Sequence, residues 1–236
     1  MSKAGLPHPA HRPHLPFNRR SFAATLFFLV VAPLLLGAQT ISIASRPDPP
    51  PVELADPIEA LIAPGAQHVS IAGTTLDIWL VKSLPLIPAS SEVSWSAVEE
   101  GTLVGAVTLS SAYRDIRGAT LKPGHYTLRF GIEPQNGDHA GVSTYREFLL
   151  LSPAAADNSA AALNHDSVVS ISRQSTGGSH PACWALDPPV ASGERVGSVR
   201  KNRAEQSAVI FSVPASRDGT DVGALKFGLV LVSTVH

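Results

Sequence analysis

The fold class is indicated most clearly by the segment Lys122-Pro123-Gly124-His125-Tyr126-Thr127-Leu128-Arg129-Phe130. Its first three residues are typical of a turn, because proline presets the first central residue and glycine accepts the positive φ of the second. Tyr126, Leu128 and Phe130 then fall on one face of a strand, and His125, Thr127 and Arg129 fall on the other. We therefore expect a strand over residues 125–132, with its aromatic and leucine side chains turned inward and its polar ones turned outward.

Short segments of the same kind follow one another along most of the chain. They are rich in apolar and β-branched residues, and clusters of Gly, Pro, Asn and Asp separate them. Gly105 is expected to mark a β-bulge, and residues 153–163 a loop with one helical turn. The expected strands cover residues 74–82, 92–98, 102–110, 125–132, 145–151, 167–173, 183–186, 208–213 and 225–233.

Many short strands with turns between them indicate an all-β protein. We predict a single antiparallel β-sandwich, of immunoglobulin-like or transthyretin-like kind, over residues 67–236. A long polar loop is expected at about residues 188–206.

The start of the chain predicts the compartment. Residues 1–38 contain four Lys or Arg and no Asp or Glu, and an uncharged apolar run follows Arg19-Arg20. A cationic start, an apolar helix-forming stretch and small residues at Gly37-Ala38 are typical of an export signal, here a signal helix. Arg19-Arg20-Ser21-Phe22 also resembles a twin-arginine signal, so Sec-type and twin-arginine export both stay open. Cleavage after Ala38 gives a periplasmic or extracellular protein.

The apolar run has a second interpretation. If it is not cleaved, residues 21–38 are just long enough to anchor the protein in the inner membrane, since spanning needs about 17–25 residues. Residues 39–66 are rich in proline, including Pro49-Pro50-Pro51, and are expected to form a spacer ahead of the folded domain. A short helix over residues 58–62 is compatible with that expectation.

The charge balance bears on partners. Without residues 1–38, the chain keeps 14 of its 18 Lys and Arg and all 19 Asp and Glu, which gives a net charge of −5. Nucleic acid and anionic membrane surfaces both require clustered positive charge, so neither is expected as a partner. A small ligand or a protein of the cell envelope fits better.

The single cysteine and the three tryptophans allow separate predictions. The single cysteine, Cys183, lies in an expected strand and excludes an intramolecular disulfide, so we expect a buried thiol that packs as a small apolar side chain. Of the three tryptophans, Trp79 lies on the strand face opposite Leu76, Ile78 and Leu80. It is therefore the one expected to be exposed.

Several segments together carry a family resemblance. Residues 116–131, which include the Lys-Pro-Gly-His-Tyr-Thr-Leu run, residues 134–142, which include Gly-Asp-His-Ala-Gly-Val, and residues 145–151 resemble a group of uncharacterised secreted bacterial proteins. His180-Pro181-Ala182 is a further shared element, and the resemblance covers roughly residues 68–186. The group has no assigned activity, so the resemblance implies a secreted β-rich domain and transfers no functional residues.

The loop over residues 133–144 is the main candidate for chemistry. It is longer than a tight hairpin requires, and it holds Asp138-His139 between two glycines. With His125 on the neighbouring strand, these residues form a candidate metal set for Zn²⁺ or Cu²⁺, which His165 or His180 could complete. Alternatively, Asn136-Gly137 is a hairpin-turn sequence that Asp138 caps, and no two histidines show the His-x-His or His-x₃-His spacing that puts both on one face.

Enzymatic chemistry has less support. No Gly-x-Ser-x-Gly elbow follows a strand, Ser170 and Ser172 fall inside an expected strand, and His180 after Gly177-Gly178-Ser179 is typical of a flexible turn. We therefore predict an exported, non-enzymatic binding or structural module. A periplasmic metal-binding protein that uses residues 133–144 is the alternative, and a hydrolase is the third possibility.

Overall fold

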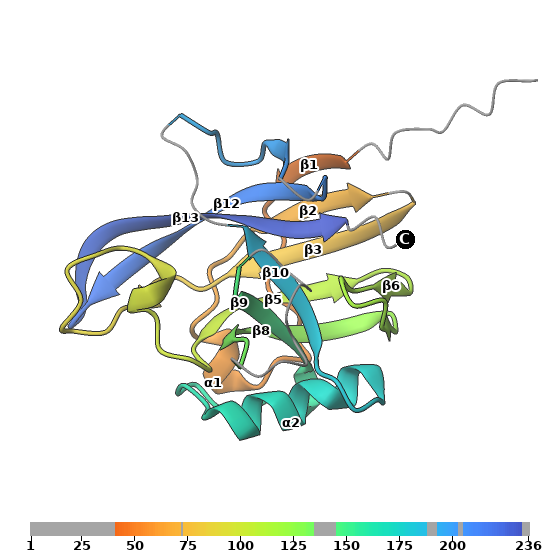
Figure 1. The fold of residues 1–236 in the computed structure, drawn as a ribbon, viewed down its shortest axis with the longest axis horizontal. Coiled ribbons are helices and arrows are strands. Elements are labelled where there is room, and N and C mark those ends of the chain that lie inside the picture. Colours follow the sequence, from red (N-terminus) through yellow and green to blue (C-terminus); the bar gives the residue numbers. More distant parts are fainter. Residues whose placement is uncertain (1–40, 72, 135–144, 188–192, 203–204, 233–236) are drawn as a thin grey trace, which may run out of the picture. The chain divides into compact units, whose positions relative to one another are not determined.

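The computed structural model describes residues 41–71, 73–134, 145–187, 193–202 and 205–232, all within one compact unit over residues 37–236. Most of these residues lie in strands (Figure 1). The helical elements are α1 (Asp56–Glu59), η1 (Trp95–Ala97), η3 (Ala154–Ala156) and α2 (His165–Thr176). The strands are β1 (Ile41–Arg46), β2 (Ala66–Ile71), β3 (Thr74–Leu80), β4 (Leu84–Pro85), β5 (Leu103–Leu109), β6 (Tyr113–Arg114), β7 (Thr120–Leu121), β8 (Gly124–Ile132), β9 (Glu147–Pro153), β10 (Ala182–Asp187), β11 (Val199–Lys201), β12 (Ser207–Arg217) and β13 (Thr220–Val232).

A large curled sheet dominates the unit. Its strand order is β1-β2-β3-β5-β8-β9-β10-β13-β12-β11, and β4 joins β12 as the parallel exception among the described pairs. β6 and β7 form a separate two-stranded ladder. The β10–β13 junction is short, with Leu186 opposite Leu229 and Asp187 opposite Gly228. The protein is thus mostly β, with a curled and predominantly antiparallel sheet.

The principal core lies on the inner face of this curl. Tyr126, Leu128 and Phe130 are buried there, as the alternation of β8 predicts. Trp95 connects two distant strands of the sheet, β8 and β13. Its ring stacks on Phe130 of β8 at a centroid distance of 5.0 Å and meets Phe227 of β13 edge-on at 5.2 Å. Offset-stacked and edge-to-face aromatic pairs add to the free energy gained from burial alone. The inner face is therefore packed with apolar and aromatic side chains.

A second, smaller core lies on the outer face of the sheet, where α2 contacts β9 and β10 (Figure 1). Phe148 and Leu150 of β9, Cys183 and Ala185 of β10, and Val168 of α2 belong to it. β9 and β10 are consequently buried on both faces.

The helix α2 corrects the strand that we expected over residues 167–173. Valine and isoleucine at three of these positions favour a strand, but local capping selects the helix. The Asn164 side chain accepts a hydrogen bond from the backbone N–H of Ser167 at 2.9 Å, and Gly177 ends the helix in the left-handed region at φ 64°. These are the N-cap and C-cap arrangements that helices prefer.

The strand expected over residues 92–98 is also wrong. The chain forms the single 3₁₀ turn η1 there, which places Trp95 in the inner core. By contrast, the expected helical turn within residues 153–163 is present as η3. The bulge predicted at Gly105 is confirmed by a register shift between Leu103 and Gly105. A Cβ at Gly105 would lie 2.2 Å from the carbonyl oxygen of Trp79, so the strands approach more closely than another residue would allow.

The segment expected to be a spacer, residues 39–66, contributes to the folded unit. β1 pairs antiparallel with β2 along its whole length, and Ile58 and Ile62 are buried. The prolines mislead here because a chain that lacks N–H groups can still pack its apolar side chains against a core. The helix expected over residues 58–62 lies slightly earlier, at α1.

The same segment explains why Trp79 is not exposed. The Trp79 side chain is 5 % exposed, and its indole N–H donates to the carbonyl oxygen of Asp48 at 3.0 Å. The prediction of an exposed tryptophan is therefore wrong, because the backbone at Asp48 lies against the Trp79 ring. Cys183, in contrast, is buried in a strand as predicted.

Two further predictions are only partly addressed. The loop expected at residues 188–206 includes β11, which pairs with β12, and residues outside the described ranges. The predicted export signal also lies outside them. None of the helices within the described ranges has the length and apolar character needed to cross a bilayer.

Candidate functional site

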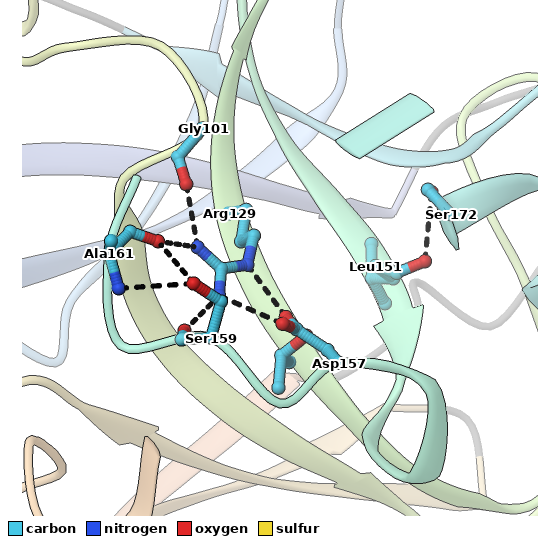
Figure 2. Close-up of polar contacts among 8 residues, drawn as sticks. Gly101, Arg129, Leu151, Asp157, Ser159, Ala161 and Ser172 are labelled. Carbon is cyan, nitrogen blue, oxygen red and sulfur yellow. Dashed lines mark hydrogen bonds and ion pairs between the residues drawn. The ribbon is translucent and has the colours of Figure 1, made fainter. Parts of the chain in front are cut away.

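The outer face of β8 carries a buried ion pair instead of the solvent-exposed side chains that its sequence predicts. Arg129 and Asp157 are both fully buried, with the Arg129 Nε 2.6 Å and Nη2 2.8 Å from the two carboxylate oxygens (Figure 2). Thr127 donates a third hydrogen bond to Asp157 at 2.6 Å. The predicted outward orientation of Thr127 and Arg129 is correct, but the predicted exposure is wrong.

All five N–H donors of the Arg129 guanidinium have partners. Besides the two bonds to Asp157, the carbonyl oxygens of Gly101 at 2.8 Å, Ala161 at 3.0 Å and Ser159 accept the remaining hydrogens. A buried charge is tolerated when its hydrogen-bonding capacity is filled, as it is here. The guanidinium thus holds residues 157–161 against β8 and has no donor left for a ligand.

A pocket of about 240 Å³ opens on the same outer face, beside α2. Its buried lining is apolar and comes from the strands: Gly131 of β8, Phe148 and Leu150 of β9, and Cys183 of β10. Burial raises the pKa of the Cys183 thiol to about 12, so this group is neutral near pH 7. The deep part of the pocket therefore offers an apolar and uncharged surface.

The helix α2 supplies one wall of the pocket. His165, Val169 and Arg173 all line it, and they are spaced four residues apart. Side chains at i, i+4 and i+8 lie along one face of an α-helix, whereas Val168 and Ser172 on the adjoining face are buried. The amphipathic character of α2 thus orients one stripe toward the sheet and a neighbouring stripe toward the pocket.

One charged pair at the pocket is engaged within the protein. The Nδ1 atom of His165 lies 2.8 Å from a carboxylate oxygen of Glu100, which also accepts the backbone N–H of Ile132 at 3.0 Å. Glu100 therefore connects the start of α2 to the end of β8. This carboxylate serves mainly to fix the pocket wall.

Three other charged side chains at the pocket, unlike Glu100 and His165, are not paired with each other. Arg117, Glu133 and Arg173 line it, and none of their charged groups forms a hydrogen bond or an ion pair with another described residue. After burial and the Asp115 carboxylate, Arg117 and Glu133 also affect the pKa of the Cys183 thiol, with opposite signs, and Arg117 interacts electrostatically with Asp115 as well. The pocket therefore presents unpaired groups of both signs over an apolar floor.

Asp115 holds the loop that carries Arg117. Its carboxylate accepts the backbone N–H groups of Arg117 at 3.0 Å, Ala119 at 2.8 Å and Cys183 at 3.2 Å. Burial nevertheless raises the pKa of Asp115 above its ordinary value, with the three hydrogen bonds and the positive charge of Arg117 opposing that rise. These bonds fix the loop of residues 115–119 to β10 and so determine where Arg117 sits.

Of the predicted metal set, His125 is the member that the structure describes. His125 lies at the start of β8, about 23 Å from Ile132 at its end, given about 3.3 Å per strand residue. Its Nδ1 lies 2.9 Å from the Thr108 hydroxyl and its Nε2 lies 3.4 Å from a Glu53 carboxylate oxygen. Asp138 and His139 are outside the described residues. Within the ranges described, no cluster of three His, Cys, Asp or Glu side chains could hold a metal ion, and the Zn²⁺ or Cu²⁺ site stays a prediction.

The structure also locates other residues that the sequence analysis named. Glu133, from the candidate loop, and His165 and His180, named as possible additional ligands, all line the pocket beside α2. The Ser172 hydroxyl donates to the carbonyl oxygen of Leu151 at 2.8 Å (Figure 2). The carbonyl oxygen of Ala182 lies 3.1 Å from the same hydroxyl. Ser172 is fully buried and therefore connects α2 to the sheet instead of acting as a nucleophile.

A larger hollow lies elsewhere in the described part of the protein. It measures about 730 Å³ and is lined by Leu61, Ile87 and Ala161, with Glu99 as its one charged lining side chain. Ligand sites combine an apolar lining with a few polar groups that orient the ligand. The pocket beside α2 meets that description better.

Comparisons with protein-family models, curated proteins and solved structures find no match to this chain. The interpretation of the pocket therefore rests on its own chemistry.

Sequence reasoning missed Arg117, Arg173 and Glu100 as pocket residues. The spacing of His165, Val169 and Arg173 could have indicated a shared face, had the segment been recognised as a helix.

Proposed function

We propose that this protein is an exported, non-enzymatic module that binds a small ligand in the pocket between α2 and the outer face of β8, β9 and β10. The observation that carries the proposal is the combination of a buried apolar lining with Arg117, Arg173 and Glu133, whose charged groups make no hydrogen bond or ion pair within the described part of the chain. Apolar surface supplies affinity, and a few oriented polar groups supply specificity. A small ligand accounts for both.

The positioning of the pocket walls supports the same proposal. The Glu100–His165 pair, the carboxylate of Asp115 and the Arg129–Asp157 pair each fix a segment that borders or supports the pocket. Walls fixed before binding lower the entropic cost of ordering a ligand. We infer a preformed site.

The scaffold and the compartment belong to the proposal as well. The packing of β12 and β13 across the inner face of β8 and β9 supports a sandwich arrangement of the curled sheet. Export rests on the charge pattern of residues 1–38 and on their uncharged apolar run. The partner is then a small molecule or a protein of the cell envelope.

The test is a thermal-shift screen of the protein purified from a bacterial host that expresses the full chain. Amino acids, short carboxylic acids, amines and small sugars are the probes, since a ligand that binds only the folded state raises Tm. The Val169→Trp variant is designed to fill the pocket with an indole. Val196→Trp, at an exposed position away from the pocket, is the matched control.

The proposal expects at least one probe to raise the Tm of the wild type and of Val196→Trp, but not of Val169→Trp. The unliganded melting curve of Val169→Trp shows whether that variant folds. If no probe shifts Tm, or if Val169→Trp responds like the wild type, the proposed pocket is not a binding site.

A further inference from the structure

We infer that the ligand of this pocket is a small zwitterion with an apolar side chain, of the kind represented by an apolar or aromatic amino acid. The inference rests on the proposed function, because it assigns a ligand class to the same pocket. It starts from three charged side chains that line the pocket, the half-buried Arg117 and Glu133 and the exposed Arg173, whose charged groups form no hydrogen bond or ion pair with another residue that the structure describes.

The signs of these charges select the ligand. Arg117 and Arg173 supply guanidinium groups, and Glu133 supplies a carboxylate. A ligand carboxylate can accept charge-assisted hydrogen bonds from guanidinium, and a ligand ammonium can donate to Glu133. Arg117 and Glu133 both line the pocket and do not pair with each other, so a ligand with two charges can contact both, although Arg117 also interacts electrostatically with the buried Asp115.

A ligand with a single charge fits less well. A simple anion would leave Glu133 without a partner in a half-enclosed site, and a simple cation would leave the two guanidinium groups without one. Charges that lose water without gaining a partner oppose binding. Glu100 is a second acidic group at the pocket, but its Oε1 already accepts from the backbone N–H of Ile132 and lies 2.8 Å from the Nδ1 of His165. Glu133 is therefore the carboxylate there without such a contact among the described residues.

The apolar lining selects the remainder of the ligand. Phe148, Leu150 and Cys183 present a buried surface, and Val169 closes it on the side of α2. A polar ligand side chain placed there would lack hydrogen-bond partners, and burying it would cost free energy. The volume of about 240 Å³ suits a single amino acid more than a longer peptide.

The experiment is isothermal titration calorimetry on the protein purified from cells that express the full chain. L-phenylalanine and L-leucine are the zwitterionic probes. 3-Phenylpropionate lacks the ammonium of phenylalanine, and 2-phenylethylamine lacks its carboxylate. The variants are Arg117→Gln, Glu133→Gln and Arg173→Gln, and the matched control is Arg46→Gln, which replaces an exposed arginine on β1.

The expected result is binding of at least one zwitterion, with both single-charge analogues weakened about tenfold or more by loss of a charge-assisted contact. Glu133→Gln and at least one arginine variant should weaken the zwitterion similarly, whereas Arg46→Gln should not. If an analogue binds as tightly as its parent, the inference is overturned while the proposed binding function survives. If neither amino acid binds, the inference is overturned, and the thermal-shift screen decides the proposed function separately.

Discussion

The two faces of the curled sheet differ in what holds them together. On the inner face, Trp95, Phe130 and Phe227 pack ring against ring within a continuous apolar core. On the outer face, a fully buried Arg129–Asp157 pair lies near a second apolar cluster and an open pocket. The inner face therefore accounts for the fold, and the outer face is where the protein can bind something.

This difference follows from physical chemistry. Apolar burial needs no partner of defined geometry, so a core can close completely. Buried polar groups need partners, and the segments that supply them, residues 157–161 and α2, cover the outer face only in part. The pocket is the part of the outer face that these segments leave uncovered. The predictions below test whether the two faces behave as separately as this account requires.

The largest expected effect is on the inner face. Phe130→Ala removes the ring on which Trp95 stacks and leaves a cavity, which should lower the free energy of unfolding by about 3–5 kcal/mol. Urea denaturation followed by tryptophan fluorescence measures this change. A loss below about 1 kcal/mol would show that the aromatic cluster does not hold the two halves of the sheet together.

A comparable effect is expected from the polar outer face. Arg129→Met leaves Asp157 buried without its counter-ion and should lower the free energy of unfolding by about 3–5 kcal/mol. The double variant Arg129→Met/Asp157→Leu should lose much less, because no uncompensated charge remains. Urea denaturation of both variants makes the comparison. If the double variant were as unstable as the single one, the carbonyl contacts of Arg129 would matter more than its charge.

A smaller effect is expected where α2 begins. Asn164→Ala removes the N-cap bond to the backbone of Ser167 and should lower the free energy of unfolding by about 1 kcal/mol. Asn164→Asp keeps an acceptor at the same position and is the matched control. Thermal unfolding by circular dichroism separates the two. No loss in Asn164→Ala would mean that α2 is held by its contacts with β9 and not by its cap, and an equal loss in Asn164→Asp would mean that the missing acceptor is not the cause.

The sequence predicted the inner face far better than the outer one. Alternation in residues 125–132 places Tyr126, Leu128 and Phe130 correctly because period-two burial is a local property of the chain. The partner of Arg129 could not be found in this way, since Asp157 is 28 residues away and lies in a segment without periodicity. The burial of the outer face could be predicted from the sequence only in part. Four consecutive apolar residues at 148–151 indicate a strand buried on both faces.

The candidate site shows the same limit. The loop at residues 133–144 was chosen for its length, and Glu133 at its start does line the pocket. Arg117 and Arg173 come from segments far apart in the chain, and only the folding of α2 onto β9 brings them to one pocket. Asn164 and Gly177, which cap α2, were the sequence features that could have predicted the helix.

The most direct test of the account is a ¹H–¹⁵N NMR titration of the protein with L-phenylalanine. We predict saturable chemical-shift changes at the backbone amides of Arg117, Val169 and Arg173, with those of Phe211 and Leu229 on the inner side unmoved. Saturable changes confined to residues outside the pocket would contradict the assignment of ligand binding to the outer face, and no saturable change at all would contradict L-phenylalanine as a ligand of the pocket.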